Sequence, residues 1–459
     1  MMHFAYFSGD LTINPSFLLI LLIELDTSYT KTTAMMRFSL LIIICLVVAN
    51  LGAMAQREVN YDESKILPYE LPQLLTSRSG KVIADQEGWD KLRRHEILED
   101  FEKHVYGKMP EGPVQVTFKV QHTDDNALGG LAIKKEIVAV FRTGRGESEM
   151  NILLYLPKNK DEKVPVFLGL NFYGNHSVHE DPSIIITKNW VRDSRDFFIE
   201  NNQATEASRG VRAVRWPVEA IIKRGYGMAT IYSGDLDPDY DDGFQNGIQP
   251  LFYRDGQNRP ETDEWGTIGA WAWGLIKAMD YFETDPDIDS DKIAVLGHSR
   301  LGKAALWAGA QDQRFAMVIS NNSGCGGAAL SRRKIGETVE IINTAFPHWF
   351  CGNFHKYNGR ENDLPIDQHM LLALIAPRPV YVASAQEDLW ADPKGEFLSL
   401  HHSGEVYKLF GHEGLVEMPQ VDVPVTNGRM GYHIRTGKHD ITLYDWERYM
   451  DFADAQWNK

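Results

Sequence analysis

Short apolar runs recur along the chain from residue 164 onward, and each has the length of a β-strand. They occupy residues 164–170, 227–232, 293–297, 316–320, 379–384 and 406–410. Runs that are apolar on both faces predict strands buried on both faces, and therefore a mostly parallel sheet with helices outside it. Most of the runs are flanked by segments with helical periodicity, and this alternation is typical of an α/β fold.

The pattern differs closer to the N-terminus. Residues 88–105 have helical periodicity, and three segments rich in β-branched residues follow them, at 114–122, 132–142 and 149–156. These segments predict an antiparallel part that precedes the parallel strands. Because no repeat or low-complexity linker interrupts the sequence, we expect residues 56–459 to form one domain with loop insertions.

An apolar run at residues 38–48 is followed by Ala53-Met54-Ala55, which fits the small-residue rule of signal peptidase. We therefore expect residues 36–55 to be a secretory signal that is cleaved before Gln56. The run is shorter than the roughly 20 apolar residues that span a membrane. The protein is expected to be secreted or periplasmic, without membrane attachment after cleavage. Since a signal starts at the N-terminus, residues 1–35 are expected to be untranslated or unfolded.

Composition narrows the class of protein. The chain has 459 residues, of which 43% are hydrophobic, so it is not a disordered chain. Its formal net charge of −16 argues against a nucleic-acid partner, which requires a basic face. Three cysteines exclude a disulfide-dense scaffold. Two of them, Cys325 and Cys351, follow the signal, and composition leaves both a disulfide and two buried thiols open. We expect a monomer.

The most informative stretch is Gly297-His298-Ser299-Arg300-Leu301-Gly302, which lies between a buried strand and a helix of small residues. This is the context of a nucleophile elbow. Gly297 fits the pattern, but Leu301 stands where a strict G-x-S-x-G motif has its second glycine. The alternative is a serine that only caps the helix. The strand–serine–helix context and the partners below favour a nucleophile.

A serine nucleophile needs a base, which should lie between the last strand and the C-terminal helix. His439 fits this place, ahead of a helix predicted at residues 445–455, and His433 is second. His412 is third because it follows the run at 406–410.

The acid that orients the base should follow the preceding strand. Asp388 after the run at 379–384 is our choice, with Glu387 as the alternative.

The oxyanion of the reaction needs preorganised donors, and the Arg300 amide and guanidinium are candidates. The alternative role for this guanidinium is a surface salt bridge with Asp312 or Asp263. A second candidate segment is 171–176, which leaves a predicted strand. The acidic loop 235–242 could bind calcium, but it lacks the rest of an EF-hand pattern, so a solvated or wall-forming loop is favoured. No other metal spacing is recognisable, and we expect no cofactor.

These motifs together resemble the glucuronoyl esterases, carbohydrate esterase family fifteen of the α/β-hydrolase superfamily. Residues 297–303 match the G-x-S-R-x-G-K elbow of that family. Other stretches are similar to its bacterial branch: LNFYGNH (170–176), NNSGCGGAAL (321–330), FPHWFCGNF (346–354), QEDLWADP (386–393) and GKHDITLYDW (437–446). The resemblance covers most of the chain after the signal.

The resemblance implies an α/β-hydrolase fold and hydrolysis of the ester between 4-O-methyl-glucuronate on xylan and an alcohol of lignin. It makes Ser299 the nucleophile, His439 the base and Arg300 the oxyanion donor. The sugar would be bound by Lys303, Glu337 and Trp349.

One departure from the family concerns the acid. Much of the family has a glutamate after the strand that follows the elbow, in a pattern like E-S-G, whereas this chain has Asn322-Ser323-Gly324. That favours Asp388 or Glu387, where some bacterial members are similar. Cys325 and Cys351 both fall within matched motifs, so the resemblance favours a disulfide between them.

Two other functions are weighed against a glucuronoyl esterase: an acetyl xylan or feruloyl esterase, and a non-catalytic pseudo-hydrolase that binds polysaccharide. Arg300 and Lys303 put two positive charges beside the serine of an acidic protein, which suits a uronate and is not needed for an acetyl group. A complete set of serine, histidine and acid argues against the pseudo-hydrolase.

Overall fold

The computed structural model describes residues 59–160 and 162–457. The expected signal at 36–55 and the segment 1–35 lie outside these residues. In the described ranges, no helix is both long and apolar enough to cross a membrane. Cleavage and export therefore stay predictions.

The centre of the fold is a ten-stranded sheet with the order β1-β2-β3-β5-β4-β6-β7-β8-β10-β9. Within this sheet order, the six neighbouring strands β5-β4-β6-β7-β8-β10 are parallel, as the apolar runs predicted. They are β4 (Val164–Asn171), β5 (Gly227–Tyr232), β6 (Ile288–His298), β7 (Met317–Asn321), β8 (Val380–Ala385) and β10 (Met430–Arg435). The predicted α/β class is confirmed.

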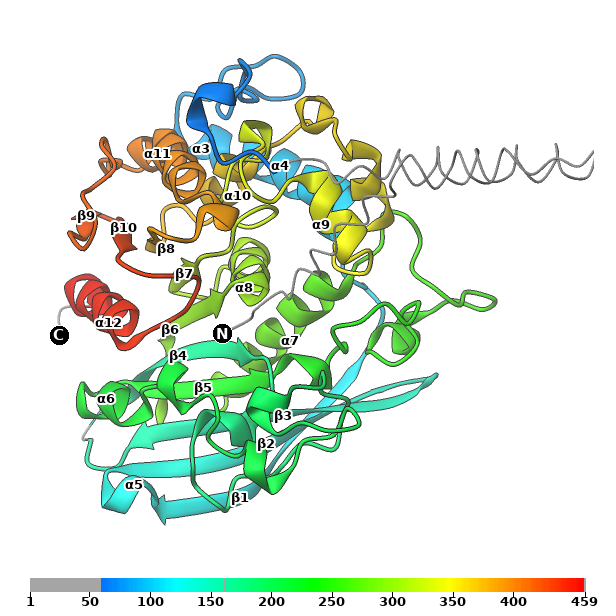
Figure 1. Ribbon diagram of the computed structural model, residues 1–459, viewed down its shortest axis with the longest axis vertical. Helices are drawn as coiled ribbons and strands as arrows, with labels where there is room; N and C mark the ends of the chain where they lie inside the picture. Colours follow the sequence, from blue (N-terminus) through cyan, green and yellow to red (C-terminus); the bar gives the residue numbers. More distant parts are fainter. Residues whose placement is uncertain (1–58, 161, 458–459) are drawn as a thin grey trace, which may run out of the picture. The chain divides into compact units, whose positions relative to one another are not determined.

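The antiparallel N-terminal part is also confirmed. It consists of β1 (Gln115–Asn126), β2 (Ala132–Thr143) and β3 (Gly146–Pro157), and β3 joins the parallel strands through antiparallel pairing with β5. In Figure 1 these cyan strands form one end of the sheet and the orange-red strands β10 and β9 (Val425–Asn427) form the other.

Helices cover both faces of the sheet. One core contains side chains of α4 (Arg94–Phe101), α7 (Thr267–Phe282), α8 (Arg300–Gln311), α10 (Gln368–Ala373) and α11 (Pro393–Leu409). The other contains side chains of α6 (Val218–Lys223) and α12 (Leu443–Trp457). Shorter helices are α3 (Gln86–Gly88), α5 (Ala127–Gly130) and α9 (Val339–Ala345).

Alternation along the central strands explains their continuous apolar runs. Val295 and Val318 pack into the first core, while the next residues, Leu296 and Ile319, pack into the second. Because successive side chains of a strand point to opposite faces, both sets must be apolar when both faces are covered.

One predicted strand is wrong. Residues 406–410 lie mostly in the last turns of α11, where Val406 and Tyr407 are buried in the first core. The last parallel strand is instead β10, whose buried residues include His433 and Arg435. These polar residues hid the strand from a search for apolar runs, and both bond to Asp445.

Candidate active site

Ser299 stands between β6 and α8 with φ +59°, a region that non-glycine residues rarely adopt. Its amide donates to the Asn321 carbonyl oxygen at 2.8 Å. A Cβ atom on Gly297 would lie 2.0 Å from the Leu301 oxygen, and one on Gly302 would lie 2.9 Å from the Gly297 oxygen. The turn therefore needs glycine two residues before and three residues after the serine, which explains the departure from the strict motif.

The structure brings His439 and Asp388 together. His439 Nδ1 donates to Asp388 Oδ2 at 2.6 Å, and Asn322 Nδ2 donates to the same oxygen at 2.8 Å. Their strands are neighbours, since Ala385 at the end of β8 pairs with Arg435 at the end of β10. Asp388 is buried and the His439 side chain is 40% exposed. The buried carboxylate thus orients a ring that solvent and a ligand can reach.

The other candidates occupy different places. Glu387 is exposed, and its amide donates to the Gly437 carbonyl oxygen. Both ring nitrogens of His433 are engaged inside the core: Nε2 donates to Asp445 and Nδ1 accepts from the Tyr381 hydroxyl. His412 follows α11 instead of a strand.

Arg300 forms an ion pair with Asp239. The sequence had suggested Asp312 or Asp263 as its partner and did not indicate Asp239. Its guanidinium also lies over the Trp349 ring, 4.7 Å from the ring centre. Burial by itself would raise the pKa of the Asp239 carboxyl. The Arg300 charge and hydrogen bonds from His348 and Trp349 outweigh burial, and the pKa lies below its ordinary value. The guanidinium is therefore held in place by a charged partner and by the Trp349 ring.

Asp239 belongs to the acidic loop 235–242, whose first three carboxylates turn inward. Asp235 accepts hydrogen bonds from Asn151 and Asn189, and Asp237 accepts from Gln249 and Thr267. Burial raises the pKa of Asp235 to about 6 and that of Asp237 to about 7. These contacts are those of a wall-forming loop.

Lys303, Glu337 and Trp349 also lie together. Lys303 Nζ donates to the Ser323 carbonyl oxygen at 2.6 Å and lies 3.9 Å from Glu337 Oε2. Burial lowers the pKa of the Lys303 ammonium and raises that of the Glu337 carboxyl. Trp349 is only 3% exposed, because its ring stacks on Phe346 at 3.8 Å. Its indole N–H donates to Asp239, so in this structure Trp349 supports Arg300.

The segment 171–176 is bonded within itself. The Asn171 side chain accepts from the Gly174 amide and donates to Asn175, and His176 shares a hydrogen bond with Ser208. Its Phe172 ring lies against the Arg300 guanidinium, 5.8 Å from the ring centre.

The expected disulfide is wrong: the structure shows Cys325 and Cys351 as buried free thiols. Cys351 Sγ lies 3.8 Å from the Lys103 carbonyl oxygen. Cys325 is buried close to the charges of Lys303 and Glu337, and burial raises its pKa well above the ordinary value. Each thiol has its own polar surroundings, which a shared motif match could not reveal.

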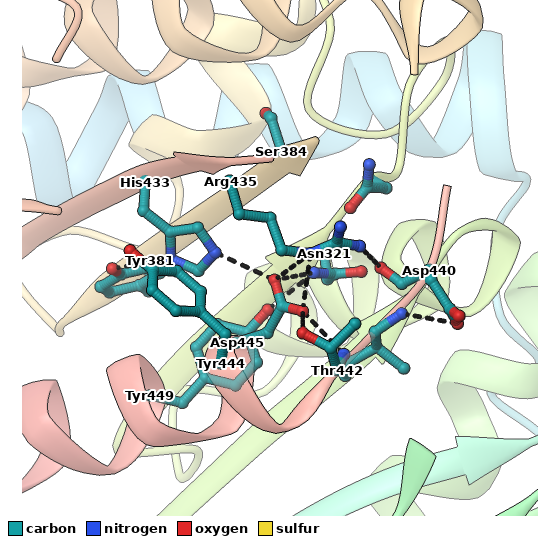
Figure 2. Close-up of polar contacts among 12 residues, drawn as sticks. Asn321, Tyr381, Ser384, His433, Arg435, Asp440, Thr442, Tyr444, Asp445 and Tyr449 are labelled. Atoms are coloured by element: carbon teal, nitrogen blue, oxygen red, sulfur yellow. Dashed lines mark hydrogen bonds and ion pairs between the residues drawn. The ribbon is translucent and has the colours of Figure 1, made fainter. Parts of the chain in front are cut away.

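A second polar cluster surrounds Asp445 at the start of α12, and sequence reasoning missed it (Figure 2). The buried Asp445 carboxylate accepts hydrogen bonds from His433, Arg435, Thr442 and Asn321. The only sequence signal was its place in the matched motif at 437–446.

This cluster holds the histidine loop from two sides. Arg435 Nη2 donates to the carbonyl oxygens of Lys438 at 3.0 Å and Asp440 at 2.6 Å, the two neighbours of His439. On the other side, Asn321 Oδ1 accepts from His298 Nδ1 at 2.6 Å, and the His298 ring centre lies 4.6 Å from that of His439. Asp445 therefore supports the candidate base from two sides, through Arg435 and through Asn321 with His298.

Taken together, the site has a serine on a strained turn, a histidine bonded to a buried carboxylate, and an arginine as the residue after the serine. These are the groups that hydrolysis of an ester through an acyl-enzyme requires.

Comparison with known proteins gives a consistent result. The family profile of fungal glucuronyl esterases matches residues 256–411. A carbohydrate esterase of an unknown prokaryotic organism is 52% identical over 400 residues, which cover 87% of this chain and 92% of that protein.

Two solved structures are similar over 86% of this chain, each with a TM-score of 0.81. One is a promiscuous esterase of family fifteen from a marine bacterial metagenome, 52% identical and 99% covered. The other is a glucuronoyl esterase from Solibacter usitatus, 48% identical and 100% covered. The chain therefore belongs to the glucuronoyl esterases of carbohydrate esterase family fifteen, and it is a carboxylic ester hydrolase.

Proposed function

We propose that this esterase cleaves the ester between 4-O-methyl-glucuronate side chains of xylan and alcohols of lignin, using Ser299, His439 and Asp388 as a catalytic triad. The hydrogen bond between His439 and Asp388, beside the serine elbow, carries the proposal. The cations of Arg300 and Lys303, one and four residues after the serine, support an acidic sugar as the acyl part.

In the proposed reaction the Ser299 oxygen attacks the ester carbonyl while His439 Nε2 takes the serine proton. Asp388 keeps the ring oriented and stabilises the imidazolium. The Arg300 amide and guanidinium stabilise the oxyanion. His439 then gives the proton to the departing alcohol, and a water molecule hydrolyses the acyl-enzyme in the same way.

The sugar part is proposed to lie at Lys303 and Glu337. The Lys303 ammonium and the Glu337 carboxyl are 3.9 Å apart, so a sugar hydroxyl between them would meet both a donor and an acceptor. Trp349 is buried under Phe346 and is proposed to act by holding the wall of this pocket.

Replacement of Ser299 by alanine tests the proposal with benzyl or methyl glucuronate as substrate. We expect hydrolysis to be lost while the circular dichroism spectrum and the melting temperature stay close to those of the wild type. Full activity of Ser299→Ala would end the proposal. Binding of glucuronoxylan without hydrolysis by the wild type would support a pseudo-hydrolase instead.

A broader ester specificity is the second candidate function. The 52% identity to an esterase described as promiscuous favours it. A higher kcat/KM on acetylated xylan or a feruloyl ester than on methyl glucuronate would make an acetyl xylan or feruloyl esterase the better description.

We also propose that the protein acts outside the cytoplasm as a monomeric single domain, residues 56–459, after removal of the signal at 36–55. The insoluble, extracellular nature of the proposed substrate supports export. N-terminal sequencing of the mature protein and gel filtration test these points, and a sequence beginning before Gln56 would contradict the cleavage site.

A further inference from the structure

A small pocket adjoins the nucleophile elbow and has no part in the triad or the proposed sugar pocket. Gly297 and His298 of the elbow line one side. Phe172 and Tyr173, which follow β4, form another wall, and Arg212 and Arg215 come from the segment before α6.

The two arginines give this cavity a positive charge. The Arg212 guanidinium lies 4.8 Å from the Phe197 ring centre and 5.9 Å from that of Tyr173. Its Nε atom is buried without a hydrogen-bond partner, and no carboxylate within 59–160 and 162–457 forms an ion pair with it. Arg215 is paired with Asp440 at 2.5 Å. Of these two guanidinium groups, only that of Arg215 is paired with a carboxylate of the described residues.

The pKa values agree with an incomplete set of partners. Burial lowers the pKa of the Arg212 guanidinium and lowers that of Arg215 to about 10, and Asp440 does not restore either to its ordinary value. Both groups stay cationic at neutral pH. A cation taken out of water without a counterion is costly, and a bound anion would offset that cost. A guanidinium fork matches a carboxylate best.

The reaction chemistry indicates which part of the ester is close to this cavity. The alcohol oxygen receives its proton from His439, so the alcohol must leave on the side of the serine where that ring lies. The His439 ring centre is 4.6 Å from that of His298, and His298 lines the cavity. The proposed sugar residues Lys303 and Glu337 lie instead with Arg300 and Trp349.

We propose that this cavity binds the alcohol part of the ester and selects alcohols that carry a carboxylate, which pairs with Arg212. The rings of Phe172 and Tyr173 offer apolar contact to an aromatic group between the ester oxygen and the carboxylate. This inference rests on the proposed function, because it assigns the second half of the same substrate.

Three glucuronate esters that differ at one position test it: the benzyl, the 4-carboxybenzyl and the 4-carbamoylbenzyl ester. The last two have nearly the same shape and differ in charge. We expect kcat/KM of the wild type to be about tenfold higher for the carboxylate than for the amide, the value of one charged hydrogen-bonded pair. Arg212→Gln should bring this ratio close to one.

Arg145→Gln is the matched control. Arg145 is a surface arginine in the turn between β2 and β3, where it pairs with Asp255, and it does not line the cavity. Its removal changes the net charge by the same amount, and the ratio between the two esters should stay at the wild-type value. Hydrolysis of the benzyl ester measures the active fraction of every variant.

The inference is overturned if the wild type has equal kcat/KM on the 4-carboxybenzyl and 4-carbamoylbenzyl esters. It is also overturned if Arg212→Gln leaves the ratio between these two esters unchanged. Absence of hydrolysis of the benzyl ester would instead refute the proposed function, and calorimetry then tests the cavity directly. Binding of 4-(hydroxymethyl)benzoate that is lost in Arg212→Gln supports the cavity. Equal binding of the benzoate and its benzamide, or binding of neither, contradicts it.

Discussion

Replacement of Arg435 by lysine tests whether the Asp445 cluster positions the candidate base. Lysine keeps a positive charge close to Asp445 but cannot reach the carbonyl oxygens of Lys438 and Asp440, which the guanidinium contacts at 3.0 and 2.6 Å. Those two carbonyl groups flank His439, so the loop loses its support on both sides of the ring.

The size of the effect follows from these contacts. Two charge-assisted hydrogen bonds, at the lower end of their usual range, contribute about 3 kcal/mol to the free energy of unfolding. For catalysis, a shift of about 1 Å in a positioned group lowers the rate up to about a hundredfold. We therefore expect Arg435→Lys to lower kcat on benzyl glucuronate by about 10- to 100-fold, with a smaller change in KM.

The assay is hydrolysis of benzyl glucuronate well below the melting temperature, together with urea unfolding of the same preparation. Arg224→Lys is the control, because Arg224 also pairs with acids of α12, Asp451 and Asp454, but is 37% exposed. Arg224→Lys should lower the free energy of unfolding by less than about 1 kcal/mol and leave kcat unchanged. A kcat of Arg435→Lys within threefold of the wild type, despite lower stability, would refute a positioning role.

Three further predictions follow from other contacts. Asp388→Asn should lower kcat by about a thousandfold or more because His439 loses its orienting carboxylate, whereas the exposed Glu387→Gln should stay within twofold; equal losses would contradict the choice of acid. Burial raises the pKa of Glu396 to about 8, so the free energy of unfolding should decline as the pH rises from about 4.5 to about 8 and this carboxyl ionises. Urea unfolding of Glu396→Gln should show a smaller decline over that range. A pH dependence identical to that of the wild type would contradict the prediction. Because Cys325 and Cys351 are free thiols, dithiothreitol should leave the melting temperature unchanged, and a fall of several degrees would indicate a bridge.

The sequence allowed the central strands to be predicted because both of their faces are apolar. The run at 227–232 coincides with β5, and the strand before Ser299 led to the elbow. The same criterion failed at β10, where the polar residues His433 and Arg435 are buried because both bond to Asp445 of the following helix. Partners that lie far apart in the sequence are not visible in a local pattern.

The site shows the same limit. Sequence order placed the acid after β8 but could not separate Asp388 from Glu387, because only the fold shows which side chain turns inward beneath Asn322. Arg300 was found as a neighbour of the serine, whereas its partner Asp239 comes from a loop 61 residues earlier. The buried position of Trp349 likewise depends on the stack with Phe346.

The parallel register of β8 and β10 has a consequence for protein engineering. Base and acid are aligned by the ladder from Met430–Val380 to Arg435–Ala385, not by the length of the chain between the two strands. A peptide tag or surface anchor inserted between Val416, which is 76% exposed, and Glu417 would therefore lengthen the connection without shifting the ladder. This loop is an attachment point for immobilising the esterase on a solid support.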